Sequence, residues 1–146
     1  MRLLILASVL VCIPGMTAPG QQPAVTVSGH PDEFQPLPKP GGKVLLGSGG
    51  YFIFGFTRPP KLGTAIMKVE VFDRNGQRDT SFVIQGDVDM PSMRGAHTLG
   101  DKPFALSSKG YYLLPVPLVM PGDWEFRFTF VKDGKPVFRG AHRFDL

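Results

Sequence analysis

The chain has almost no cysteine. Its 146 residues include a single one, Cys12, which lies in the apolar N-terminal stretch. The rest of the sequence therefore forms no disulfide, offers no thiolate to a metal and has no cysteine nucleophile. The G-x-S-x-G, H-E-x-x-H and phosphate-loop motifs are also absent, so no recognisable pattern positions a nucleophile or a base. We expect a protein that is not an enzyme.

Long hydrophobic runs are lacking as well. The longest, Leu3 to Ile13, has eleven residues, which is too short for a membrane-spanning helix and typical of a signal-peptide core. Arg2 precedes it, and the small residues of Ala18-Pro19-Gly20 follow it as a cleavage site. We expect a signal peptide over residues 1–20, export to the periplasm or the extracellular space, and a mature chain without a membrane span. The alternative is a short membrane anchor or a buried helix. Lipidation of Cys12 is the weaker interpretation, because Val11 stands where a small residue is usual.

Charge is modest and scattered. The formal net charge is +4, and the 16 lysines and arginines form no run. A solvated protein surface explains this distribution better than a nucleic-acid interface does.

The remaining sequence alternates with the period of β-strands and shows no helical period. Residues 21–42 are rich in proline and glycine and read as an extended arm, with Ala24–Ser28 as its one strand-like stretch. Residues 43–146 predict an all-β domain, an immunoglobulin-like two-sheet β-sandwich of about seven strands. The predicted core is Phe52, Phe54, Phe56, Val69, Val71, Phe82, Ile84, Trp124, Phe126 and Phe128.

Three details of this pattern bear on the architecture. Pro115 and Pro117 make the segment 110–120 an edge strand or an irregular one. Residues 102–107 fit one short strand. Asp87 and Asp89 share a strand face, and we expect both to be solvated rather than to act as an acid–base pair.

Soft metal ligands gather at two strand ends. Met90, Met93 and His97 lie in one predicted loop, and Met120 precedes the turn into the strand of Trp124. Thioether sulfur and imidazole suit copper in an oxidising compartment. The alternative is that Met90, which continues an inward-facing phase, plugs the end of the core.

These residues carry a resemblance. The run from Asp89 to Met93, then His97, Lys109-Gly110-Tyr111 and the stretch from Met120 to Phe126, is similar to the YtkA-like/FixH-like domain family over about residues 44–137. The resemblance implies an exported or membrane-tethered immunoglobulin-like sandwich with a part in copper handling or oxidase assembly. Its implied metal site is Met90, Met93, His97 and Met120. The sequence departs from the members that carry further Met or His residues in this loop. Arg94 stands beside Met93 here, and a cation at that place disfavours a bound metal ion.

Two functions follow as expectations. The first is an exported, non-enzymatic module that binds or traffics copper, with a copper donor or acceptor in the envelope as its partner. The alternative is a structural or protein-interaction accessory domain of an envelope complex that holds no metal.

Overall fold

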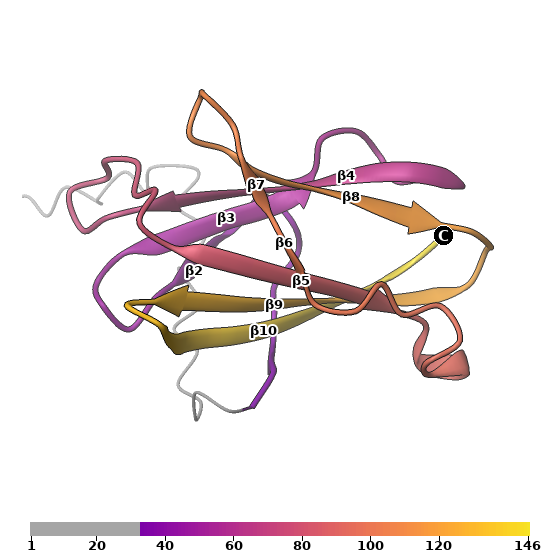
Figure 1. Ribbon diagram of the computed structural model, residues 1–146. Coiled ribbons are helices and arrows are strands. Elements are labelled where there is room, and N and C mark those ends of the chain that lie inside the picture. The colour runs from indigo at the N-terminus through magenta and orange to yellow at the C-terminus, as the bar shows by residue number, and fades with distance from the viewer. Residues whose placement is uncertain (1–32) are drawn as a thin grey trace, which may run out of the picture.

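The computed structural model describes residues 33–146, which form two five-stranded sheets packed face to face (Figure 1). The predicted signal peptide, Cys12 and Ala24–Ser28 lie outside the described residues. The first sheet has the order β1 (Gln35–Pro36), β10 (Lys135–Asp145), β9 (Asp123–Lys132), β5 (Val83–Asp89) and β6 (Lys102–Pro103). The second sheet has the order β2 (Lys43–Leu45), β3 (Tyr51–Phe56), β4 (Gly63–Phe72), β8 (Tyr112–Leu118) and β7 (Ala105–Leu106). A 3-10 helix, η1 (Pro91–Met93), follows β5.

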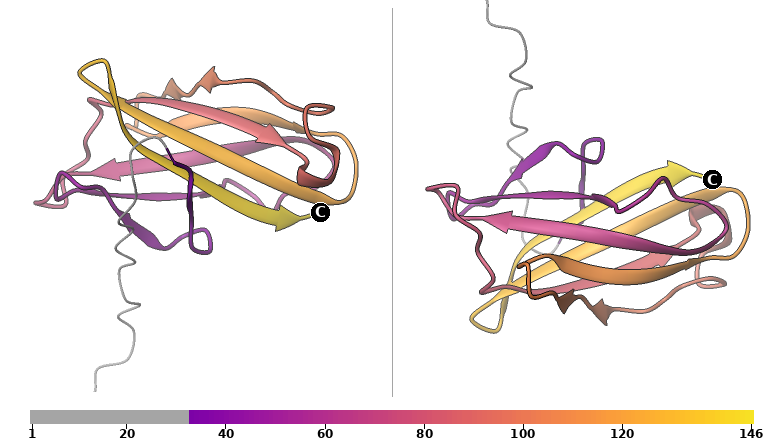
Figure 2. Two further views of the ribbon diagram at one scale, coloured as in Figure 1. Left: turned by 90° about the horizontal axis from the view of Figure 1, so that it is seen from below. Right: turned by 90° about the horizontal axis from the view of Figure 1, so that it is seen from above.

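The predicted all-β sandwich is confirmed, and Figure 2 shows its two layers from below and above. The described residues form ten strands rather than about seven, because β1, β2, β6 and β7 span only two or three residues each. Strands this short have too few residues to show an alternating pattern. The single strand expected over residues 102–107 is wrong, because the segment crosses from β6 in the first sheet to β7 in the second. Phe104 lies between the two strands and is buried.

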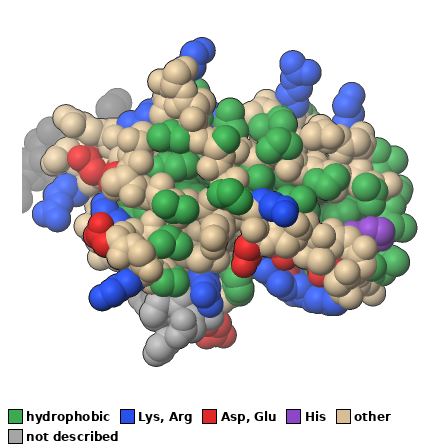
Figure 3. Space-filling model, viewed as in Figure 1, with side chains coloured by type: hydrophobic (Ala, Val, Ile, Leu, Met, Phe, Trp, Pro, Cys, Tyr) green, Lys and Arg blue, Asp and Glu red, His purple; other side chains and the backbone are tan. Residues whose placement is uncertain are grey.

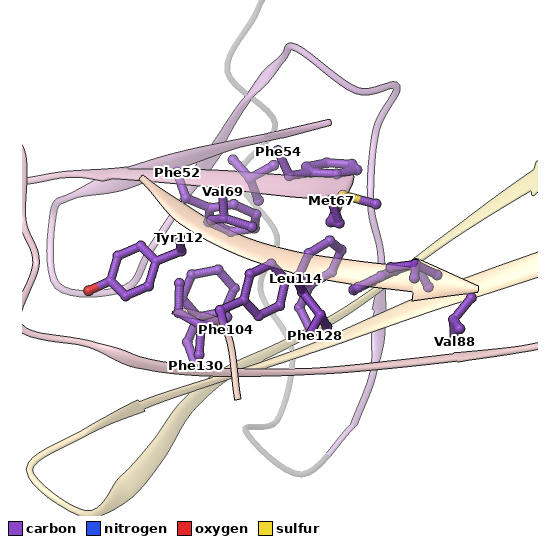
Figure 4. Packing of buried hydrophobic residues seen from close by; sticks show 14 of the residues in the cluster. Phe52, Phe54, Met67, Val69, Val88, Phe104, Tyr112, Leu114, Phe128 and Phe130 are labelled. Carbon is purple, nitrogen blue, oxygen red and sulfur yellow. The ribbon is translucent and has the colours of Figure 1, made fainter. Parts of the chain in front are cut away.

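The core lies between the inner faces of the two sheets (Figure 4). Successive side chains of a strand point to opposite faces, so the alternating aromatic residues of β3 and β9 all turn inward. The rings of Phe52 and Phe130, from opposite sheets, have centroids 4.5 Å apart. Every predicted core residue is buried except Phe56, which is partly buried and packs against the cluster.

On the side that faces β7, the strand β8 is paired only at its first residues. β7 pairs with β8 only at Tyr112 and Leu113, and the Ser107 N–H donates to the Tyr111 carbonyl. Because backbone polar groups alternate in direction along a strand, the nitrogens of Pro115 and Pro117 face the same side as that carbonyl. No other strand of the described residues pairs there. β8 thus lies between β4 and β7 in the sheet order, and the expected edge character holds only for its second half, which contains the two prolines.

β1 adds to the free side of β10 as the one parallel pair described, with Gln35 opposite Gly140. These residues fall within the 21–42 arm of the sequence-based division, yet they belong to a sheet. Leu37 continues the pairing by donating its N–H to the Ala141 carbonyl, and its side chain packs against the core. Residues 35–37 therefore cover the sandwich on this side.

Candidate functional site

The two segments that carry the candidate metal ligands meet at one end of the sandwich. β5 and β9 are paired up to Asp89 and Glu125, so the loop after β5 and the turn before β9 emerge side by side. The backbone N–H of Ser92 donates to Asp123 Oδ2 at 3.0 Å, and the Ser92 hydroxyl donates to the other oxygen of the same carboxylate. Figure 3 shows hydrophobic side chains gathered around a histidine at the end where β8 terminates.

Trp124 is the centre of this end. Its side chain is fully buried, and its indole N–H donates to the Met120 carbonyl at 3.1 Å. The His97 ring lies 6.2 Å from the Trp124 ring, centroid to centroid. Met90 reaches the turn between Met120 and Trp124, where a Cβ on Gly122 would stand only 2.8 Å from the Met90 methyl carbon. The structure thus brings Met90, His97 and Met120 to the first residues of β9 and the turn before them.

The four candidate ligands differ in exposure. Met90 is 2% exposed and belongs to the core, as the core-plug alternative predicted. Met93 is 43% exposed. His97 and Met120 are partly buried. Met93, His97 and Met120 are therefore the donors with exposed surface, and Met120 also packs against the core cluster to which Met90 belongs.

Asp89 corrects one expectation from the sequence. It is buried rather than solvated, and its two oxygens accept backbone N–H groups from Met90 and Gly95, each at 2.9 Å. A buried carboxylate needs such partners, and the loop supplies them by folding back over the end of β5. At the start of β9, hydrogen bonds from Ser92 hold the pKa of Asp123 below its ordinary value. Both carboxylates fix the loop.

Arg94, the residue that departs from the family pattern, is ion-paired. Its Nη1 lies 3.0 Å from Oε1 of Glu125. Arg127 and Arg143 contact the same carboxylate at 2.9 and 2.7 Å. Sequence reasoning missed Glu125 because it occupies an ordinary outward position of β9, and its link to Arg94 spans 31 residues. The one available signal was a glutamate between two inward aromatic residues.

Among the residues that the structure describes, no group of three or more His, Cys, Asp or Glu side chains is arranged to hold a metal ion. The candidate set differs from such groups, since three of its four members are methionines. In the same part of the chain, no helix has the length and hydrophobicity needed to cross a membrane.

Comparison with known proteins gives no match to a family model, to a curated protein or to a solved structure. The likeness to the YtkA-like/FixH-like family consequently rests on the motifs around Met90, Tyr111 and Trp124 alone.

Proposed function

We propose that this protein is an exported, non-enzymatic β-sandwich that binds copper at the end of the sandwich around Trp124. The observation that carries the proposal is the convergence of the segments of Met90, His97 and Met120 on the start of β9. Sulfur and imidazole donors from a loop and a turn then share one small region. A site of this kind favours Cu(I) over Zn(II).

Rigidity of the surrounding backbone supports this proposal. The loop is tied to β5 and β9 through Asp89 and Asp123, and the Met120 carbonyl is tied to Trp124. Ligands held in place before binding lose less conformational entropy when they grip an ion. The ion pair with Glu125 directs the Arg94 guanidinium to the first sheet, where Arg127 and Arg143 share the same carboxylate.

The test is a titration of the purified protein with Cu(I), supplied anaerobically with a competing chelator. We expect one ion per chain and quenching of tryptophan fluorescence. Trp124 is the only tryptophan in the sequence, and its ring is 6.2 Å from that of His97, so its emission reports on this end alone. Zn(II) at the same concentration should neither compete nor quench.

The informative variant is the triple change Met93→Leu, His97→Ala and Met120→Leu, which removes the accessible donors and keeps most of the bulk. It should lose copper binding while its unfolding free energy changes little. Met67→Leu is the matched control, because Met67 is a fully buried methionine outside the candidate set. Absence of Cu(I) binding by the unchanged protein, or equal binding by the triple variant, would rule the copper site out.

A second candidate function is a protein-interaction domain without a metal. The observation in its favour is the exposure of aliphatic side chains near this end, Leu62 and Val119, which neighbour the paired residues Gly63 and Leu118. Exposed aliphatic side chains that cluster mark interaction surfaces in many proteins. Under this function Leu62→Ser and Val119→Ser abolish association with the envelope partner, and the triple variant leaves that association intact.

A further inference from the structure

Arg94 stands in the loop between two candidate ligands, Met93 and His97, and its guanidinium reaches back to the first sheet. The side chain of Arg94 is 45% exposed, whereas that of its partner Glu125 is 6% exposed. The carboxylate belongs to the rigid strand β9, and the arginine belongs to the loop. The ion pair is therefore a tether that fixes the loop to the sheet.

The Glu125 carboxylate has hydrogen-bond partners outside the loop. Arg127 donates to its Oε1 and Arg143 to its Oε2, and both arginines belong to strands of the first sheet. Loss of the Arg94 contact thus leaves a buried carboxylate that is still paired, which avoids the large penalty of an isolated buried charge. The tether can be removed with little effect on the fold.

Arg94 acts together with two neighbouring contacts of the same loop. Ser92 is bonded to Asp123, and the Gly95 N–H is bonded to Asp89. Met93 is therefore flanked by residues that are each attached to the ends of β5 or β9. The backbone bond from the Ala96 N–H to the Met93 carbonyl, at 3.0 Å, carries this constraint onward toward His97.

We infer that Arg94 is a positioning residue of the copper site: its ion pair with Glu125 holds the loop so that Met93 and His97 present their donors together. The inference rests on the proposed copper function and adds to it a means of control. Binding and the tether are thermodynamically linked, so whatever loosens the ion pair weakens copper binding, and copper in turn stabilises the tether.

The test compares Cu(I) affinities, measured by chelator competition, for the unchanged protein and three variants. Arg94→Gln, which removes the charge and adds no sulfur, should weaken binding about three- to tenfold, the range for a partly exposed charged contact that preorganises a site. Arg94→Lys should recover most of the affinity, because a lysine can still pair with the carboxylate. Arg143→Gln is the matched control: it takes a different arginine from the same Glu125 and leaves the loop residues unchanged, and it should stay within about twofold of the unchanged protein.

The outcomes separate this inference from the proposed function. If the unchanged protein binds no Cu(I), the proposed function fails and the inference fails with it. If the unchanged protein binds Cu(I) but Arg94→Gln binds it equally well or more tightly, only the tether is refuted. Equal weakening by Arg94→Gln and Arg143→Gln would also refute it, because the effect would then come from the sheet and not from the loop.

Discussion

The ring of Phe104 occupies the space between the two sheets where a side chain at Gly86 would begin. A Cβ on Gly86 would stand 2.7 Å from Phe104 Cε2, 2.8 Å from Leu114 Cδ2 and 3.0 Å from Phe126 Cε1. Glycine is thus the only residue whose volume fits beneath this ring. Phe104 closes the side of the sandwich where the chain crosses from β6 to β7.

Gly86→Ala should therefore destabilise the protein by about 1–3 kcal/mol, the cost of forcing extra volume into a packed core. Chemical denaturation measures the change. Gly47→Ala serves as the control, because a Cβ at that position would meet no atom within 4 Å and the φ of Gly47 is not in the left-handed region. An unchanged unfolding free energy for Gly86→Ala would mean that Phe104 does not fill this space in solution.

Trp124→Ala should cost about 3–5 kcal/mol of unfolding free energy, because a fully buried indole leaves a large cavity. Trp124→Phe should cost less, since most of the volume remains and only the hydrogen bond to Met120 is lost. Far-UV circular dichroism follows the unfolding of both variants, which have no tryptophan emission. A loss below about 1 kcal/mol for Trp124→Ala would contradict the burial described.

His142 should make the protein less stable in acid. It is partly buried between the rings of Phe54 and Phe144, and burial lowers the pKa of His142 although a hydrogen bond with the backbone of Leu37 acts the other way. The unfolded state therefore takes up a proton more readily than the folded state. Stability from this group is complete above the ordinary imidazole pKa of about 6.5 and is lost as the pH falls through the lower folded value.

The measurement is the unfolding free energy of the unchanged protein and of His142→Phe at pH 7.5 and pH 5. Phenylalanine keeps the aromatic packing and cannot titrate. The unchanged protein should lose more stability between the two pH values than the variant loses. Equal losses would show that His142 is not the group responsible.

The prolines of β8 should keep the protein from associating through that edge. Pro115→Val combined with Pro117→Val adds two N–H donors to the open side of the strand, and such donors pair readily with another chain. We expect dimers or larger species in size-exclusion chromatography with light scattering. Thr64→Val is the control, because Thr64 pairs with Pro117 on the same face but lies in the interior strand β4. A double variant that stays monomeric would contradict this account of the edge.

The core was predictable from the sequence because alternation is a local property. Phe52 and Trp124 turn inward for the same reason, the two-residue period of a strand, and no knowledge of partner strands was needed. Phe56 is the partial exception because it ends β3, where the sheets no longer fully cover it. The short strands β6 and β7 escaped prediction because each exists only through its pairing with a longer neighbour.

The arrangement of the candidate site depended on contacts that no local pattern contains. Met90 and Met120 lie near the same turn because β5 pairs with β9. Residue spacing alone does not determine the register of that pairing. Asp89 looked solvated because its partners are backbone N–H groups, which have no signature in the sequence. The pairing of Arg94 with Glu125 was hidden for a similar reason, since 31 residues separate them.

The parallel pairing of β1 with β10 also links the two ends of the described chain. β10 runs toward the end of the sandwich that holds Trp124 and η1, and β1 runs in the same direction. The first and the last strand of the described residues are therefore fastened to each other. Any opening that detaches β10 from β9 also releases residues 35–37, so both ends of the described chain should become exposed in the same step.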